Sequence, residues 1–202
     1  MNSCRRTDIY VVRHAHVHNP DDILYGRLPR FHLSDLGLNQ ANKLAAFLAG
    51  RPIEAIYSSP LLRARQTAGT IAQVLPGVPV RRSSLILEVR TGYEGEPNSI
   101  LQPGFSFYEP LVRETDESME AVYVRVSRFL RRIARRHAGK SVVAVTHADP
   151  IAIMRLGLLG LPFSVSNLHS TVYPARASIN LVTLTPEQDP VLTYFNVSGE
   201  RL

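Results

Sequence analysis

The chain has 202 residues, of which 45% are hydrophobic and 20% charged, and its formal net charge at pH 7 is +6. This composition excludes disordered and fibrous classes, and the length suits a single domain over residues 1–202. No apolar run approaches the roughly 18 residues of a membrane helix, the N-terminus lacks an apolar signal core, and Cys4 is the only cysteine. We therefore expect a cytoplasmic protein with no internal disulfide and no membrane partner.

The first half of the chain predicts two strands, each followed by a helix. Residues 9–12 form a short apolar strand, and the helix at 34–48 has Ser34 as its N-cap. The apolar residues expected on the buried face of this helix are Leu38, Ala41, Leu44, Ala45 and Leu48. A strand at 55–57 leads to Ser59 and Pro60, which are expected to cap and open the second helix. Residues 80–87 are expected to be extended.

The second half begins with an irregular excursion at 91–117, rich in glycine, proline and glutamate. Loops this long inside a compact domain are commonly lids or substrate-binding segments. A basic amphipathic helix follows, and its apolar residues recur at helical spacing. They are Met119, Val122, Val126, Phe129, Leu130 and Ile133. The arginines of this helix are expected to form its solvated face, and a functional basic patch is the alternative. They are Arg125, Arg128, Arg131, Arg132, Arg135 and Arg136.

A buried strand at 141–146, a helix at 150–159 and two strands at 177–184 and 191–197 complete the pattern. Strands that alternate with helices predict an α/β fold, here a single three-layer α/β/α domain. The sheet is expected to be mainly parallel with an antiparallel edge strand. The last strand could pair with a second copy, so a homodimer is one expected assembly.

Charged groups fall at the carboxyl ends of the predicted strands. Arg13 and His14 end the first strand, Arg63 follows the second, and His147 follows the strand at 141–146. In open α/β sheets that edge is where ligands bind. One histidine there could be a core residue, but two histidines and two arginines at equivalent strand ends indicate a functional site.

Five segments carry a resemblance to a known family. In chain order they are VVRHAHVHNP, LYGRLPRFHLSDLGLNQA, IYSSPLLRARQTA, LEVRTGYEG and VVAVTHADPI. From about residue 8 to residue 160 they resemble the histidine phosphatase superfamily, the phosphoglycerate-mutase-like enzymes. The resemblance implies the phosphoglycerate-mutase-like fold and a phosphatase that acts on a small anionic phosphorylated substrate, with no metal and no other cofactor.

The resemblance also implies roles for five residues. His14 would be the nucleophile and form a phosphohistidine, while Arg13, Arg63 and His147 would hold the phosphoryl oxygens. Glu88 would donate a proton to the leaving group, with Glu94 and Glu117 as competing acids. Phosphoryl transfer spreads negative charge over three oxygens, which suits the paired donors of arginine. Because His14 must be neutral to attack and a protonated His147 would add charge, we expect their pKa values to be pushed apart.

Residues around the phosphate pocket are expected to bind the rest of the substrate. They are His16, Asn19, Tyr25, Arg27, Ser58, Arg90, Tyr93 and Ala148. Arg27 or Arg90 could meet a carboxylate or a second phosphate of the substrate, or could lie in solvent. His16 stands where the family usually has an acid, and Asn19 lies one residue before the family's usual asparagine position. These departures bear on specificity more than on the core reaction.

Other interpretations remain open from the sequence. His14, His16 and His18 form an H-x-H-x-H run that could share a zinc ion in a metal hydrolase. Within the resembled family the chain could be a phosphomutase, although its compact length favours hydrolysis. It could also be a phosphate-binding regulatory module without turnover. Nucleic acid is not an expected partner, because no recognition motif accompanies the positive charge.

Overall fold

The computed structural model describes residues 6–170 and 173–199, so Cys4 lies outside the described residues. Its sheet has the strand order β3-β2-β4-β1-β5-β6. These strands are β1 (Thr7–Arg13), β2 (Ile53–Ser58), β3 (Val80–Arg82), β4 (Ser141–Thr146), β5 (Ile179–Leu184) and β6 (Val191–Phe195). The first four in the sheet order run parallel, β5 is antiparallel to β1, and β6 is antiparallel to β5. The expected α/β sheet, mainly parallel with an antiparallel edge, is confirmed.

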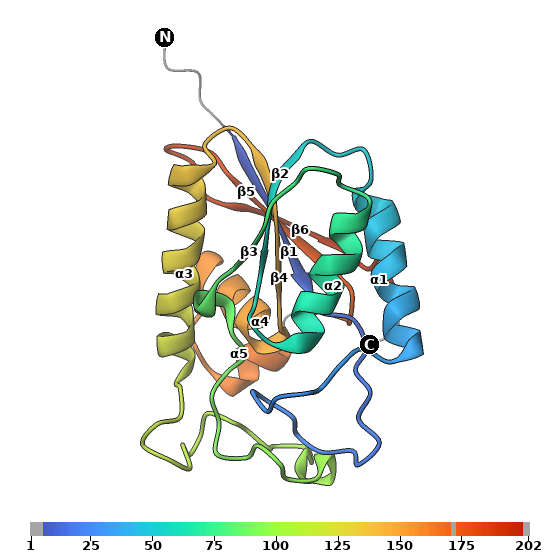
Figure 1. The fold of residues 1–202 in the computed structure, drawn as a ribbon. Coiled ribbons are helices and arrows are strands. Elements are labelled where there is room, and N and C mark those ends of the chain that lie inside the picture. Colours follow the sequence, from blue (N-terminus) through green and yellow to red (C-terminus); the bar gives the residue numbers. More distant parts are fainter. Residues whose placement is uncertain (1–5, 171–172, 200–202) are drawn as a thin grey trace.

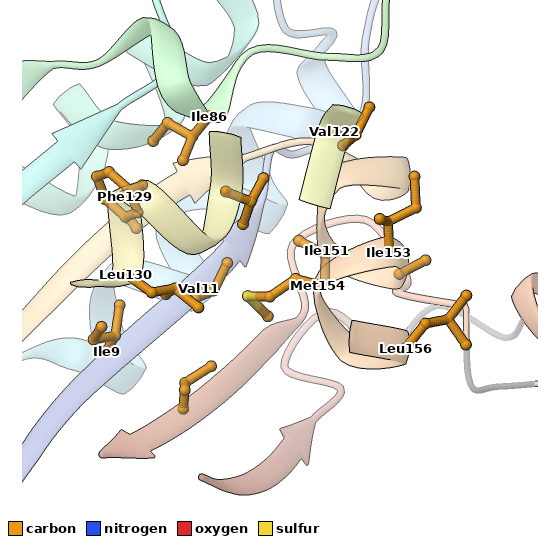
Figure 2. Close-up of a cluster of buried hydrophobic side chains, with 14 of the residues drawn as sticks. Ile9, Val11, Ile86, Val122, Phe129, Leu130, Ile151, Ile153, Met154 and Leu156 are labelled. Carbon is orange, nitrogen blue, oxygen red and sulfur yellow. The ribbon is translucent and has the colours of Figure 1, made fainter. Parts of the chain in front are cut away.

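Helices cover both faces of this sheet (Figure 1). They are α1 (Asp35–Leu48), α2 (Leu62–Gln73), α3 (Met119–Arg136), α4 (Ala148–Leu158) and α5 (Val165–Ser170), with 3-10 turns η1 (Ser84–Ile86) and η2 (Asn98–Ile100). Successive strand residues point to opposite faces. Ile9 and Val11 therefore pack with α3 and α4, the core drawn in Figure 2, whereas Tyr10 and Val12 pack with α1 and α2. The result is the expected three-layer α/β/α arrangement.

Helix α1 begins as expected, because the Ser34 hydroxyl accepts a hydrogen bond from the Gly37 backbone N–H at 3.1 Å. The expected buried face is wrong at Leu38, whose side chain is 44% exposed. Gly37 and Gln40 are buried instead. A Cβ at Gly37 would collide with the His16 carbonyl, so glycine lets the helix pack against the loop that follows β1. The start of α1 thereby supports one wall of the candidate site.

Two other expectations need correction. Helix α2 begins at Leu62 with Leu61 at its N-cap, so Ser59 is not the cap. The Ser59 hydroxyl lies 2.7 Å from His147 Nε2 instead, and this tertiary hydrogen bond prevails over the local capping preference. Residues 80–87 are extended only in β3, after which the chain turns through η1.

Helix α3 buries all six of the expected apolar residues. Its arginines do not all lie in solvent, because the Arg125 side chain is only 13% exposed. Arg125 donates to the carbonyls of Leu85 and Leu87 and to the Glu117 carboxylate. The expectation of a wholly solvated basic face is therefore wrong at Arg125, which fastens α3 to the segment after β3.

Two long connections lie beyond the carboxyl ends of the parallel strands, at the lower end of the molecule in Figure 1. They are the 17–33 loop and the irregular 91–117 excursion. The two are joined by a bridge between Ile23 and Pro97 and by a hydrogen bond from the Leu24 N–H to the Glu96 carbonyl at 2.7 Å. Among the described residues, no helix combines the length and apolar character needed to cross a bilayer.

Candidate active site

The carboxyl ends of β1, β2 and β4 bring distant residues to one point. The backbone N–H of His14 donates to the Thr146 carbonyl at 2.9 Å, and that of Ser59 donates to the Val145 carbonyl at 2.9 Å. The rings of His14 and His147 meet edge to face, with centroids 5.1 Å apart. Sheet register therefore places side chains from residues 14, 59 and 147 in contact range of one another.

His14 is held as a neutral imidazole with a defined tautomer. Its Nδ1 lies 2.8 Å from the Ala15 carbonyl, which can only accept, so Nδ1 carries the proton. Its Nε2 lies 3.1 Å from Arg63 Nε, which can only donate. Burial, followed by the charges of Arg63 and Arg13, holds the pKa of His14 well below its usual value. The lone pair of Nε2 is consequently available to attack an electrophile.

Arg63 lies in the first turn of α2, and its charged side chain is only 1% exposed. Its Nη2 donates to the Gly26 carbonyl, and its guanidinium carbon lies 4.7 Å from the centroid of the Tyr25 ring. Arg65, two residues further along α2, is exposed. Arg13, the last residue of β1, donates from Nη1 to the Pro174 carbonyl at 2.7 Å. Two guanidinium groups from different segments thus act on His14, and the charges of both lower its pKa.

His147 is held by Ser59 through its Nε2 and approaches Glu88 through its Nδ1, which lies 3.8 Å from Glu88 Oε2. Among the described residues, neither His147 Nδ1 nor Arg13 Nε has a hydrogen-bond partner, although both are buried. Burial, then the charges of Arg63 and His14, lowers the pKa of His147 well below its usual value. The two histidine pKa values are therefore not pushed in opposite directions in the free protein, because burial, and after it the charge of Arg63, lowers both.

Glu88 is the acid whose environment favours the protonated form. Burial, reinforced by the charge of Asp149 and opposed by Arg63, raises the pKa of Glu88 to about 7. Glu117 differs: burial raises its pKa, but the hydrogen bond and charge of Arg125 outweigh burial and leave the pKa lowered. Glu94 accepts a hydrogen bond from the backbone N–H of Arg27. Glu88 thus combines a raised pKa with a carboxylate oxygen 3.8 Å from His147 Nδ1.

A cavity of about 700 Å³, here called the main cavity, lies beside this cluster. Its wall includes Arg13 and Glu88 together with four of the expected substrate-binding residues, His16, Asn19, Tyr25 and Ala148. Cavities of roughly 300–1,000 Å³ hold small-molecule ligands. The main cavity thus has the size of a binding site and carries two of the expected catalytic groups in its wall.

The other four expected substrate-binding residues lie outside this lining. The Arg27 guanidinium donates to the Glu117 carboxylate and to the Glu88 backbone carbonyl, so it is already hydrogen-bonded within the protein. The Ser58 hydroxyl donates to the Ser59 carbonyl, Arg90 is exposed, and the Tyr93 ring packs on Phe105. Within the lining, the Asn19 side chain donates to the Ile23 carbonyl and accepts from the Ile23 N–H, so it stabilises the conformation of the 17–33 loop.

A model of the histidine phosphatase superfamily (branch 1) matches residues 9–197. The chain belongs to this superfamily. A phosphoserine phosphatase of Hydrogenobacter thermophilus is 32% identical over 166 residues, which are 77% of this chain and 78% of that protein. An uncharacterized protein of Mycobacterium tuberculosis is 36% identical over 164 residues, 76% and 79% of the two chains.

Solved structures agree with the family assignment. A phosphoserine phosphatase mutant of Entamoeba histolytica, in complex with phosphoserine, superposes with a TM-score of 0.78 at 25% identity. The match covers 96% of this chain and 98% of that one. The histidine phosphatase described here is accordingly a phosphoric monoester hydrolase.

The structure also assigns contacts in this histidine phosphatase that the sequence did not reveal. Asp149 lines the main cavity, and its two carboxylate oxygens accept hydrogen bonds from the hydroxyls of Tyr108 at 2.7 Å and Tyr173 at 2.6 Å. Asp149 lies two residues after His147 in the VTHADPI segment, so its position near the strand end was a signal. Its tyrosine partners were not readable, because they come from the excursion and from the segment after α5.

The H-x-H-x-H run of this histidine phosphatase does not converge. His16 Nδ1 lies 2.7 Å from the Ser34 hydroxyl, and the His18 ring stacks on His32. Within residues 6–170 and 173–199, no group of three or more histidine, cysteine, aspartate or glutamate side chains is arranged to hold a metal ion. The described geometry therefore gives no support to the zinc interpretation of this run.

Proposed function

We propose that this phosphatase hydrolyses a small-molecule phosphate monoester through a phosphohistidine on His14, with Glu88 as the proton donor and without a metal ion. The observation that carries the proposal is the hydrogen bond from Arg63 Nε to His14 Nε2. It fixes an unprotonated nitrogen at the end of β1 among groups that can stabilise a phosphoryl oxygen.

In the first step His14 Nε2 attacks phosphorus and the bond from phosphorus to the leaving oxygen breaks. The leaving oxygen takes the proton of Glu88, whose pKa near 7 keeps much of it protonated at neutral pH. The imidazole ring becomes positively charged, and the Ala15 carbonyl at Nδ1 stabilises that charge. The products of this half-reaction are an alcohol, a phosphohistidine and the Glu88 carboxylate.

In the second step a water molecule attacks the phosphohistidine. The Glu88 carboxylate takes a proton from this water, the bond from phosphorus to Nε2 breaks, and its electron pair returns to His14. Inorganic phosphate leaves and both residues regain their starting protonation. One carboxyl group thus acts as acid and then as base, which its intermediate pKa suits.

The phosphoryl oxygens have donors suited to them. Arg13 Nε and His147 Nδ1 are buried and have no hydrogen-bond partner among the described residues, and Arg63 reaches the same point from α2. A bound phosphate dianion would favour protonation of His147, because a nearby opposite charge stabilises the charged form. The neutral His147 of the free enzyme is thus compatible with a cationic His147 in the substrate complex.

The relatives support a small phosphorylated substrate. The Hydrogenobacter thermophilus relative is a phosphoserine phosphatase, and structures of the Entamoeba histolytica enzyme are complexes with phosphoserine and with 3-phosphoglyceric acid. These compounds share a phosphate ester on a small organic body, and we extend only that class to this chain.

The test is rapid quenching with radiolabelled phenyl phosphate, together with assays of phosphate release. Wild type should give an acid-labile protein adduct, and His14→Ala should give none and lose at least about 10⁴-fold in kcat/KM. His32→Ala is the matched control because His32 is exposed and outside the main cavity lining. Turnover that survives in His14→Ala, or an adduct on another residue, would reject the proposal.

A further inference from the structure

A second cavity adjoins the main cavity, and no role in the reaction proposed above uses it. Its volume is about 310 Å³, and it shares the wall residues Leu101, Phe107, Asp149 and Tyr173 with the main cavity. We call it the aromatic lobe. The remainder of its lining comes from the excursion and from α5, which both lie at the lower end of the molecule in Figure 1. The four shared residues place the lobe directly beside the main cavity.

The lobe has aromatic walls with a defined arrangement. Phe105 packs edge to face on Phe107, with centroids 5.1 Å apart, and Phe107 meets Tyr108 in the same manner at 6.5 Å. Val165 and Leu168 of α5 complete the apolar lining. Leu101, at the shared wall, leaves 46% of its surface exposed. Aromatic rings that meet edge to face offer flat apolar surfaces, which favour a bulky apolar or aromatic group.

The charges of the lobe exclude an anionic ligand body. Of the described residues that line it, none is lysine, arginine or histidine, and the one ionisable acid is Asp149. Both oxygens of Asp149 already accept tyrosine hydroxyls. A substrate carboxylate or second phosphate would find no cation there and would be repelled by Asp149. The main cavity differs from the lobe, because Arg13 and Arg176 line it and the charges of both act on His14.

Arg27 and Arg90, the two residues considered for a second anionic group, do not alter this conclusion. Arg27 is paired with Glu117 at 2.6 Å, and neither arginine lines either cavity. The aromatic lobe is thus mainly apolar, and no lysine, arginine or histidine is among the described residues that line it. These features differ from what a short, charged leaving group such as serine requires.

We propose that the natural substrate is the phosphate monoester of an alcohol with a bulky, non-anionic apolar or aromatic body, which occupies the aromatic lobe while the phosphoryl group lies at His14. This inference rests on the proposed function and narrows its substrate class. Burial of apolar surface in the lobe supplies the selectivity.

The wild-type test compares three esters of primary alcohols: propyl phosphate, phenylbutyl phosphate and O-phosphoserine. Propanol and phenylbutanol are chemically similar leaving groups, so a difference between their esters reports binding of the body. We expect kcat/KM for phenylbutyl phosphate to exceed that for each of the other two esters by about tenfold or more. Equal values for the two alkyl esters, or a preference for phosphoserine, would overturn the inference and leave the proposed function intact.

Variants then locate the preference. Phe105→Ala removes a ring that lines the lobe but not the main cavity, and Val165→Asp places a carboxylate in the lobe. Each should reduce the advantage of phenylbutyl over propyl phosphate to about threefold or less. Leu111→Ala, an exposed apolar residue of the same excursion outside both linings, should retain it. An advantage that persists in both lobe variants would overturn the inference.

The two proposals fail in different ways. If wild type hydrolyses neither these esters nor phenyl phosphate, the proposed function falls and this inference falls with it. If phenyl phosphate is hydrolysed through the His14 adduct but the bulky alkyl ester has no advantage, only the inference falls. The comparison of esters uses wild-type protein, so it decides the inference even where a variant fails to fold.

Discussion

Arg63 and His14 come from different elements, α2 and the end of β1, and the Arg63 Nε–H donates to His14 Nε2 across 3.1 Å. This contact keeps Nε2 unprotonated, because a protonated nitrogen could not accept from a guanidinium. The same charge contributes to the lowered pKa of His14. In the proposed reaction a phosphoryl group would take the place of this hydrogen bond, so Arg63 prepares the nucleophile first and stabilises the transferred group afterwards.

Replacement of Arg63 by lysine tests this double role. A lysine keeps the positive charge but lacks the fork that reaches both His14 and the Gly26 carbonyl. We expect Arg63→Lys to lower kcat/KM for phenyl phosphate by about 10²–10³-fold. Arg65→Lys, on the exposed side of the same helix turn, should remain within about twofold of wild type. Equal activity of the two variants would contradict the role assigned to Arg63.

The pH dependence of kcat/KM follows from Glu88 and His14, because this parameter reports groups of the free enzyme. Glu88 must be protonated to act as an acid and has a pKa of about 7, so activity should fall as the pH rises above about 7. His14 must be neutral, and its pKa lies well below 6.5, so the acid limb should lie well below that pH. A profile of kcat/KM for an alkyl phosphate would show an optimum on the acid side of neutrality.

The variant Glu88→Gln identifies the group behind the alkaline limb. It cannot donate the proton, so the alkaline limb should disappear and alkyl phosphates should lose about 10²–10⁴-fold in rate. The loss should be much smaller with p-nitrophenyl phosphate, because nitrophenolate leaves without protonation. Glu96→Gln, at an exposed position of the excursion, should keep the wild-type profile. Equal losses for both classes of ester would argue against Glu88 as the donor.

Ser59 provides a test of how His147 is positioned. Its hydroxyl is the hydrogen-bond partner of His147 Nε2 at 2.7 Å, and both side chains are fully buried. Ser59→Ala would leave a buried imidazole nitrogen unpaired, which costs about 1–3 kcal/mol. We expect a lower free energy of unfolding in urea and a reduced kcat/KM. Ser84→Ala, at an exposed serine after β3, is the control, and matching values for both variants would contradict the positioning role.

The sequence predicted the residues at the carboxyl ends of parallel strands. Arg13, His14 and His147 come together because parallel strands end at a common sheet edge, so a strand prediction is already a prediction of proximity. The helix cap at Ser59 was wrong for a physical reason. A serine before a proline satisfies the local rule for a helix cap. That rule does not include tertiary contacts, and here the His147 ring at the end of β4 is hydrogen-bonded to the same hydroxyl.

Arginine roles were the least predictable from sequence. Arg125 lies in a run of arginines with helical spacing, and only the folded chain shows that it contacts Glu117 and the segment after β3. Arg27 was considered as a substrate ligand, yet it pairs with the same carboxylate. Pairs between residues as far apart as 27 and 117 depend on where two long loops meet. Neither periodicity nor spacing contains that information.

The Glu117 ion pairs yield a prediction about stability. Glu117 accepts from Arg27 Nη2 at 2.6 Å and from Arg125 Nε at 2.9 Å, and its side chain is 20% exposed. Glu117→Gln removes the charge between two partly buried arginines, so we expect a loss of about 1–3 kcal/mol in the free energy of unfolding at neutral pH. Urea titration measures this loss, and Glu114→Gln, at an exposed position, should show almost none.

The pH dependence of that loss distinguishes an ion pair from a packing effect. Although burial raises the pKa of Glu117, the Arg125 hydrogen bond and charge lower it below the ordinary value of 4.5. A depressed folded-state pKa contributes stability that is complete above 4.5 and is lost as the pH falls through the folded pKa. The difference between wild type and Glu117→Gln should therefore shrink in acid. A difference that stays constant across this range would show that the carboxylate charge does not stabilise the contact.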